Sequence, residues 1–509
     1  MSGGHQSEGM SRRTFLRTGA VGAGVLAVGG VQLVTAPAGL AARGGKKGTT
    51  ERYPLFVPET VSPSGLVLTA GPEFDVDVSG GTGQQLAGAW AYNGSFPGPT
   101  IVARQGDVAT IDLTNLLPDE TITHWHGMIV PHLADGHPLQ AVEPGHTFEY
   151  PPFTILPQQR ATLNWYHPHP HFLTGEQVAM GLAGAFIIRD GEEDALELPS
   201  GPYEVPLVIR DAKFNNRGNL VFKRSKAGFF GDTPLVNGTV RPYLEVDQGV
   251  YRFRVLNGAN ARVFSLALSN GANFTVIGND GGLLPSAEPV SEIRFSPGER
   301  LDLLVDFTEL PEYDPDNPEV WTLRDLDQRW DLLEFRGTAQ GGAPSPDVSS
   351  LPAITPLTDP VTTRQFSFDG MSRINGREFE FDRVDYEVPA NQVERWIFTT
   401  GGNGPHPVHT HGAYFQVQSR SGGRGGTVFP WETGWKDTVL LEDGETVEVL
   451  VRFDEDFVSE PSSGAPRPSE TTVDGSGFDD DPGLYLLHCH KLSHEDAGMM
   501  LNFRVVRPV

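Results

Sequence analysis

The sequence of 509 residues has a single cysteine, Cys489. One cysteine cannot form a disulfide within the chain, so the fold has to be stabilised without such cross-links. A lone cysteine is often only a small buried apolar residue. Cys489 stands between two histidines, however, and this setting favours the ligand role developed below.

Basic residues and long apolar runs are also scarce. The 38 Lys and Arg residues are outnumbered by 65 Asp and Glu residues, which gives a formal net charge of −27. This charge argues against nucleic acid or an anionic membrane surface as a partner. After the N-terminal segment no run is apolar enough to span a bilayer, so we expect no stable membrane insertion of the mature chain.

The N-terminus reads as a targeting signal. Ser11-Arg12-Arg13-Thr14-Phe15-Leu16 resembles the twin-arginine export motif, and a Gly/Ala-rich, weakly apolar stretch follows it. We predict a signal peptide over residues 1–42, recognised by the twin-arginine export machinery. The mature protein would be periplasmic, extracellular or on the cell surface; a retained anchor is the alternative.

The rest of the chain is long enough for two to four domains and contains a repeat. Asn-Gly dipeptides at Asn93, Asn237 and Asn375 each precede a run of alternating apolar and polar residues, although the third copy is weaker. The copies are 144 and 138 residues apart, a spacing that fits whole domains. Each copy therefore predicts a turn followed by a half-buried strand.

These features predict an all-β protein of three domains. Helical periodicity is scarce, while 60 Gly and 41 Pro provide frequent turns between short strands. We place the domains at residues 51–195, 200–340 and 361–509. The Gly/Pro/Ser-rich segment Gly337–Pro360 would link the last two domains, and Asp454–Pro482 would form an acidic surface loop.

Four His-X-His pairs stand out among the 15 histidines: His124 and His126, His167 and His169, His409 and His411, His488 and His490. On a strand, residues i and i+2 face the same side about 7 Å apart. That distance suits two adjacent metal ions better than one. Eight imidazoles from the first and third domains are enough for a three-metal cluster, and neutral imidazole binds Cu, Zn, Fe and Ni alike.

Strand alternation gives Cys489 a different role. If His488 and His490 face one side of a strand, Cys489 faces the other and should bind another metal. The partners available to it are His406, His494 and Met499. Two histidines, a thiolate and a weak methionine ligand form the blue-copper electron-transfer set.

At these residues the chain resembles the multicopper oxidase family. The resembling segments are His124–Gly127, Trp165–His169, His406–Gly412 and His488–Met499, with Gly181–Gly184 and Gly434–Val439 as further matches to the three-domain bacterial laccases, bilirubin oxidases and cuprous oxidases. The resemblance implies three cupredoxin-like Greek-key β-barrel or sandwich domains. It also implies four coppers per chain, one of type 1, one of type 2 and two of type 3.

The family pattern then distributes the ligands. It implies type 1 copper at His406, Cys489, His494 and axial Met499, and type 2 copper at His124 and His409. The type 3 pair would take His126, His167, His169, His411, His488 and His490. Asp135 and Glu495 stand where the family has acids that supply protons. Electrons would enter at the exposed edge of His406 or His494 and cross Cys489, and O₂ would be reduced to two waters.

The other histidines are predicted to be non-ligands. We expect this for His5, His132, His137 and His146, and we expect packing or hydrogen bonding to a ligand for His171.

Three functions stay open at this point. The first is a laccase-like oxidase of phenols, aromatic amines or tetrapyrroles, with O₂ and a small reducing substrate as its partners. The second is a cuprous oxidase for copper tolerance. The seven methionines argue against it, because they do not form the cluster of thioethers that would select Cu(I). The third is a copper-free relative used in envelope assembly, which would lack ligands that this chain retains.

Overall fold

The computed structural model describes residues 51–72, 75–78, 84–402, 404–423, 426–454 and 483–507. The predicted export signal at residues 1–42 lies outside the described residues. So does the predicted acidic loop, of which only Asp454 is described. In the described part of the chain, no helix combines the length and apolar character needed to cross a membrane.

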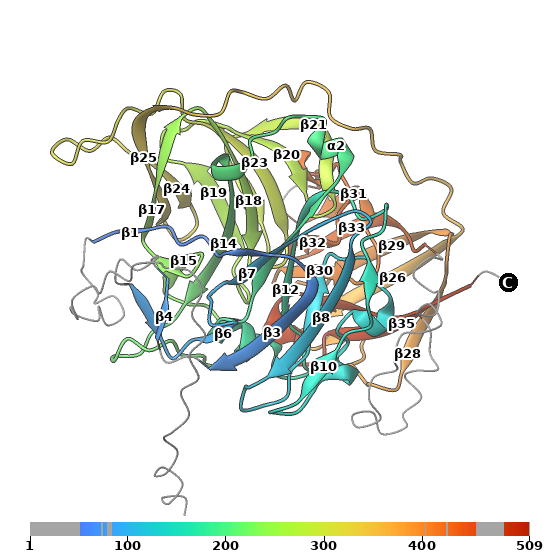
Figure 1. Ribbon diagram of the computed structural model, residues 1–509. Helices are drawn as coiled ribbons and strands as arrows, with labels where there is room; N and C mark the ends of the chain where they lie inside the picture. The colour runs from blue at the N-terminus through green and yellow to red at the C-terminus, as the bar shows by residue number, and fades with distance from the viewer. Residues whose placement is uncertain are drawn as a thin grey trace, which may run out of the picture. The chain divides into compact units, whose positions relative to one another are not determined.

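Strands dominate the described chain, which confirms the predicted all-β class (Figure 1). The helices are short: α1 (Thr174–Met180), α2 (Gly191–Asp194) and α3 (Leu492–Glu495), with 3-10 turns at His132–Ala134, Pro138–Gln140, Gly201–Tyr203 and Pro430–Glu432. A separate two-stranded ribbon joins β4 (Asp75–Asp77) to β5 (Gln85–Ala87).

The first part of the chain forms two packed sheets. One has the order β10 (Thr147–Glu149), β8 (Val108–Asn115), β3 (Ser64–Pro72), β6 (Trp90–Tyr92), with β11 (Phe153–Thr154) beside β8. The other has the order β2 (Thr60–Val61), β7 (Gly98–Arg104), β13 (Gly184–Arg189), β12 (Thr162–Pro168), β9 (Thr123–His126). Buried and less buried residues alternate along β8, so its apolar side faces the core between the sheets.

The second part repeats this plan with larger sheets. One has the order β1 (Tyr53–Pro54), β17 (Pro242–Gln248), β25 (Trp330–Gly341), β24 (Trp321–Asp325), β19 (Phe264–Leu268), β22 (Ile293–Phe295). The other has the order β16 (Thr239–Val240), β15 (Thr233–Val236), β14 (Glu204–Ala212), β18 (Val250–Asn257), β23 (Arg300–Asp306), β20 (Phe274–Asn279), β21 (Gly282–Val290).

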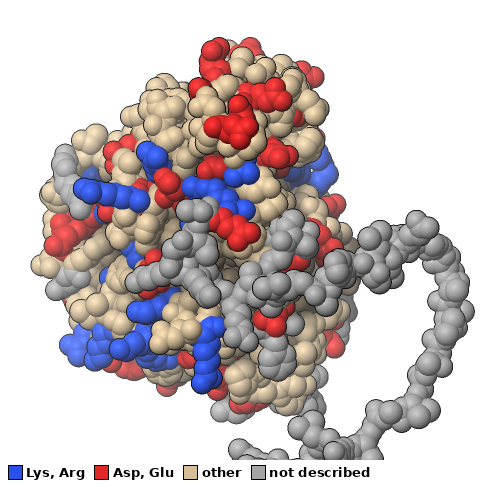
Figure 2. All heavy atoms as spheres, turned by 90° about the vertical axis from the view of Figure 1, so that its left-hand side faces the viewer, with Lys and Arg blue, Asp and Glu red and all other residues tan. Residues whose placement is uncertain are grey.

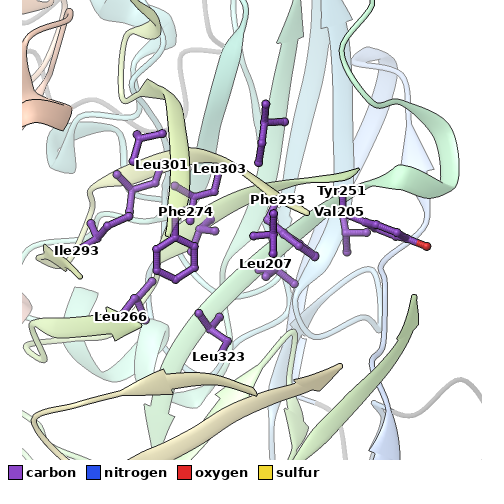
Figure 3. Close-up of a cluster of buried hydrophobic side chains, with 14 of the residues drawn as sticks. Val205, Leu207, Tyr251, Phe253, Leu266, Phe274, Ile293, Leu301, Leu303 and Leu323 are labelled. Carbon is purple, nitrogen blue, oxygen red and sulfur yellow. The ribbon is translucent and has the colours of Figure 1, made fainter. Parts of the chain in front are cut away.

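The core of this second part lies between its two sheets. In Figure 3, Leu266 and Leu323 from one sheet meet Phe253, Phe274 and Leu303 from the other. All five side chains are buried. Burial of each such side chain stabilises the fold by about 1.5–3 kcal/mol.

The third part again has two sheets. One has the order β27 (Arg373–Ile374), β26 (Thr362–Asp369), β29 (Val393–Thr400), β33 (Glu445–Arg452), β31 (Phe415–Gly422). The other has the order β28 (Val384–Pro389), β35 (Met500–Val506), β34 (Leu484–Cys489), β30 (His406–Thr410), β32 (Thr438–Leu441). Cys489 and Met499 belong to the buried core of this part.

The repeated Asn-Gly turn is confirmed in all three parts. Asn93, Asn237 and Asn375 have φ of 52°, 48° and 53°, and a glycine with positive φ follows each one. Their side-chain oxygens accept the N–H of Thr69, Val208 and Ser367 at 2.6, 2.7 and 2.7 Å. Each side-chain amide also donates to the carbonyl two residues earlier on that strand. One local device therefore fixes the same turn three times, while the exact domain limits stay predictions.

Candidate metal centre

Two antiparallel strand pairs bring the predicted histidine pairs together. In the first domain β9 pairs with β12, and His124 lies opposite His167. In the third domain β30 pairs with β34, and His409 lies opposite His488. The second member of each pair follows two residues later, so each domain presents four imidazoles at neighbouring strand ends.

The imidazoles of the two domains meet face to face. The rings of His124 and His411 stack with centroids 3.8 Å apart, and those of His126 and His409 stack at 3.7 Å. All eight side chains are at most 1% exposed. Their nitrogens form three groups in which one atom from each residue lies within 4.8 Å of the others: His124, His126 and His409; His126, His167 and His490; His169, His411 and His488.

The ring nitrogens are arranged as metal ligands require. The Nδ1–H groups of His124, His167 and His409 donate to backbone carbonyls at 2.8–2.9 Å, which leaves each Nε2 as the lone-pair atom. These three Nε2 atoms are buried without a hydrogen-bond partner. A buried nitrogen without a partner is costly, and a metal ion would satisfy it.

The facing nitrogens of His411 and His488 also indicate a metal site. His411 Nδ1–H donates to Asp135 Oδ2 at 2.7 Å, so its Nε2 is also a lone-pair atom. This Nε2 lies 3.1 Å from His488 Nε2. The residues present therefore fit a metal cluster, because a cation could bind the lone pairs of both facing nitrogens.

Burial holds the imidazoles in the neutral form that metals bind. It lowers the pKa of His126, His167, His169, His411 and His490 well below the usual value, and the neighbouring imidazoles add to this. Burial likewise lowers the pKa of His409 to about 4, against the opposing effect of Asp437. Protons therefore compete little with a metal at neutral pH.

Cys489 faces away from this cluster, as strand alternation predicts. Its Sγ lies 3.4 Å from His406 Nδ1 and 3.8 Å from His494 Nδ1, and the two nitrogens are 3.3 Å apart. Helix α3 turns the chain so that Met499 returns to Cys489, whose backbone N–H donates to the Met499 carbonyl at 3.1 Å. All four side chains are buried.

Burial keeps the Cys489 thiol and both histidines of this second group neutral when no metal is bound. Burial raises the pKa of the Cys489 thiol to about 12 and lowers that of His406 to about 4 and that of His494 to about 2. A bound metal would reverse the effect on the thiol. The prediction that one of these histidine edges is exposed is wrong, because the surrounding chain buries both: His406 is 0% and His494 1% exposed.

Both predicted proton donors touch the cluster. Besides its bond to His411, Asp135 places Oδ1 3.4 Å from His124 Nδ1. Glu495 places its oxygens 3.3 Å from His488 Nδ1 and 3.7 Å from His169 Nδ1. Each carboxylate thus contacts one histidine of the first domain and one of the third.

Sequence reasoning missed a buried charge network behind the cluster. Asp437 Oδ1 lies 3.2 Å from His126 Nε2, and the Asp437 carbonyl accepts from His409. Arg300, from the second domain, donates two hydrogen bonds to the Asp437 carboxylate at 2.7 and 2.5 Å. Although burial favours the neutral acid, Arg300 holds the pKa of Asp437 well below its usual range.

Lys436 extends this network. Its Nζ lies 2.9 Å from Asp280 and 3.1 Å from Glu299, both in the second domain. The sequence does place two opposite charges, Lys436 and Asp437, directly before the apolar strand β32. This pattern could have indicated a buried ion pair, but it was used only as part of the family resemblance.

The histidines predicted to be non-ligands belong to none of the candidate ligand groups found among the described residues. His137 Nε2 bonds to Asn502, and the His171 ring packs at a tilt on Phe172 and edge-on against Phe379. His5 lies outside the described residues.

The segment Trp431–Asp437 borders two cavities. Trp435 and Tyr414 line a cavity of 580 Å³, and Trp431 lines another of 380 Å³ that includes Glu442. Glu442 follows Leu441, the residue paired with His406.

Known proteins share this architecture. Models of a family described as multicopper oxidase match residues 77–193, and residues 349–458 and 465–508. The multicopper oxidase mco of Staphylococcus haemolyticus is 33% identical over 81% of this chain and 83% of its own length. The laccase of Bacillus subtilis is 30% identical over 82% of this chain and 90% of its own length.

Two further similarities bear on function and fold. The cell division protein FtsP of Shigella dysenteriae is 32% identical over 72% of this chain and 79% of its own length. The crystal structure of the McoA multicopper oxidase from Aquifex aeolicus superposes with a TM-score of 0.76 at 34% identity. It covers 89% of this chain and 99% of that one, which supports three cupredoxin-like domains.

The Arg300–Asp437 pair gives a stability prediction. Arg300→Met leaves a buried carboxylate without its cation, so the unfolding free energy of the metal-free protein should fall by about 3–5 kcal/mol. Urea unfolding measures this. Arg324→Met, which breaks an exposed pair with Asp331, is the control and should cost less than about 1 kcal/mol. Equal losses in the two variants would contradict the assigned role of Arg300.

The buried histidines give a pH prediction. His137, His406 and His409 have pKa values of about 4 when folded, below their unfolded value of about 6.5. The unfolded chain binds protons first, so the stability they contribute is present above pH 6.5 or so and is lost toward about pH 4. Urea unfolding of the metal-free protein across this range should show the loss. His137→Gln should make it shallower by roughly 2–3 kcal/mol; an unchanged slope would refute the assignment to His137.

Proposed function

Since this chain belongs to the multicopper oxidase family and is therefore an oxidoreductase, we propose that it is a laccase-like oxidase. It would oxidise phenols, aromatic amines or tetrapyrroles by one electron at a time and reduce O₂ to two waters. One observation carries the proposal. Of three consecutive residues, Cys489 belongs to one buried ligand group, which contains its thiol, while His488 and His490 belong to the other, which contains eight imidazoles.

The proposal assigns four coppers to these groups. His406, Cys489, His494 and Met499 would hold type 1 copper, and His124 and His409 would hold type 2 copper. The type 3 pair would be held by His126, His167, His169, His411, His488 and His490. Copper bound there would supply the one-electron chemistry that links a reducing substrate to O₂.

The chain itself supplies the connection between the two groups. Cys489 is bonded through the backbone to His488 and His490, whose rings belong to the imidazole cluster. The backbone N–H of His490 donates to the Pro407 carbonyl at 2.7 Å, which fixes this strand end to β30. The two groups therefore keep a constant covalent separation.

Asp135 and Glu495 are proposed to hold and deliver protons. Asp135 would do so from Oδ2, beside His411, and Glu495 from the oxygen beside His488. Both are buried carboxylates next to the place where O₂ reduction consumes four protons, which is the position a general acid needs.

Two alternatives have less support. A cuprous oxidase would be favoured by clustered thioethers, but the methionines of the described chain are spread over Met128, Met180, Met371, Met499 and Met500. A copper-free relative in envelope assembly is the other alternative, and one relative is named a cell division protein. All twelve predicted ligands are present here, and those of each group lie together, which favours the oxidase.

The proposal keeps export through the twin-arginine machinery, with the protein acting outside the cytoplasm.

Copper content tests the assignment. Protein made with copper present should be blue and hold four coppers per chain. Cys489→Ser should lose the blue absorption, at least one copper and the oxidation of organic donors, because the thiolate is gone. Metal analysis, absorption spectra and O₂ consumption measure this, with His146→Ala at an exposed non-ligand as control. Retained O₂ consumption in Cys489→Ser would overturn the electron route, and protein without copper would overturn the proposal.

Asp135→Asn tests the proton role. The amide can still accept a hydrogen bond from His411 but cannot supply a proton, so reoxidation of the reduced enzyme by O₂ should slow at least about tenfold. Reduction by an organic donor should stay as fast as in the wild type. Stopped-flow spectroscopy separates the two steps, and Asp119→Asn at an exposed site is the control. Equal slowing of both steps would count against Asp135 as the proton source.

A further inference from the structure

Lysines are rare in this chain, and two of them, Lys226 and Lys491, lie near the Cys489 group. After residue 50 the sequence has five: Lys213, Lys223, Lys226, Lys436 and Lys491. Lys436 is buried in the charge network, and Lys491 follows His490 directly. The other three lie in the segment 213–230 between β14 and β15. Basic side chains do gather locally on this acidic protein, as the lower left of Figure 2 shows.

The segment 213–230 carries a strong local charge of one sign. It contains five basic residues and no acidic one, in a chain of net charge −27. The five are Lys213, Arg217, Lys223, Arg224 and Lys226, and all are exposed. Within the described part of the chain none of them has an acidic group within 4 Å, whereas exposed Arg104 and Arg324 are both paired. These cations are therefore available to an external anion.

Contacts place the end of this segment over His494. The backbone of Lys226 faces the His494 ring without a hydrogen bond to its Nε2. Gly228 lies so close to Lys491 that a Cβ there would be 3.0 Å from Lys491 Cε. Lys491 Nζ in turn lies 5.9 Å from the ring centre of Phe230. Because the Lys226 side chain is exposed, a single residue connects the buried His494 ring to the surface.

The two histidine edges of the Cys489 group differ in charge. Lys491 has the largest charge effect on His406, but Asp443 and Asp369 oppose it there. His494 is influenced by Lys491 and faces the Lys226 backbone, while Arg224 acts on the buried Asp496 beside α3. Buried Glu495 faces the imidazole cluster instead. The surface above His494 is therefore the cationic side of the group.

Aromatic side chains flank these cations. Phe230 is 46% exposed, and Phe172 is 54% exposed. Arg224 donates to the Phe172 carbonyl, which ties the segment to the first domain at this point. A surface that combines cations with exposed rings suits a flat ligand that is both aromatic and anionic.

We propose that the reducing substrates are aromatic donors carrying a carboxylate or sulfonate, which dock over His494 against exposed Lys223 and Lys226 with Phe230 beside the ring, while the charge of the buried Lys491 adds to the attraction. This rests on the proposed oxidase function. Each phenolic donor loses one electron and releases its phenolic proton to solvent. Four such oxidations supply the electrons that convert one O₂ and four protons into two waters. The same cations would repel Cu(I), which separates this substrate class from the cuprous alternative.

Syringate and methyl syringate provide a matched pair of donors, because the ester removes only the charge. Two unit charges about 7 Å from a carboxylate in water each change its binding by about threefold. Lys223→Gln/Lys226→Gln should therefore lower the kcat/KM ratio of syringate to methyl syringate about fivefold to tenfold, mainly through KM. Raising the salt from about 0.01 M to about 1 M should lower the wild-type ratio toward that of the variant. Arg224 is left intact because it holds Phe172.

Binding gives a second readout that does not depend on turnover. Trimethoxybenzoate keeps the carboxylate but cannot be oxidised at a phenol, so its affinity for copper-loaded and copper-free protein can be measured by ligand-observed NMR. The double variant should weaken this affinity about fivefold, and the control Arg104→Gln/Arg395→Gln, at exposed paired cations, should leave it and the kinetic ratio unchanged.

The outcomes separate the two proposals. If both donors are oxidised but the wild type and the Lys223/Lys226 variant have the same ratio and the same trimethoxybenzoate affinity, the substrate class is wrong and the oxidase function stands. If the copper-loaded protein oxidises neither donor while trimethoxybenzoate binding still depends on the two lysines, the oxidase function is wrong. A control variant that lowers the ratio as much as the double variant would also overturn the docking site, since general charge would then explain the effect.

Discussion

The structure depends on the packing of eight neutral imidazoles between the first and third domains. Each ring nitrogen buried there without a hydrogen-bond partner costs stability, so the site exists only because the surrounding fold holds it. Backbone carbonyls fix the outer nitrogens of His124, His167 and His409, and Asp135 and Glu495 each reach across the domain boundary. The same unpartnered nitrogens thus lower the stability of the metal-free fold and give it the capacity to bind metal.

The second domain contributes no histidine to this arrangement but supports it from two directions. Arg300 and the acids Asp280 and Glu299 neutralise Asp437 and Lys436 next to the cluster. The end of the segment 213–230 lies beside the other group, because the Lys226 backbone faces His494 and Gly228 lies against Lys491. A buried carboxylate such as Asp437 is stable only beside its cation. The second domain therefore helps to hold the residues that surround both ligand groups.

Local rules of sequence predicted much of this and failed where contacts are distant. Period-2 alternation placed Cys489 opposite His488 and His490, and the Asn-Gly turns at Asn93, Asn237 and Asn375 revealed three equivalent domains, because both features depend on neighbouring residues alone. Arg300 and Asp437 are 137 residues apart, and no pattern in either segment points to the other. The basic run at 213–230 is visible in the sequence, but its position over His494 is a property of the folded chain.

The division of the imidazole cluster between two domains has a thermodynamic consequence. Any metal that binds all three groups of nitrogens binds the assembled domains and not the separated ones, so its binding free energy adds to the cohesion between them. By mass action, that contribution grows with the logarithm of the free metal concentration. The free energy of unfolding of the metal-loaded protein then depends on the free metal concentration as well as on the sequence. A fall in that concentration lowers the free energy of unfolding, as a low concentration of denaturant would.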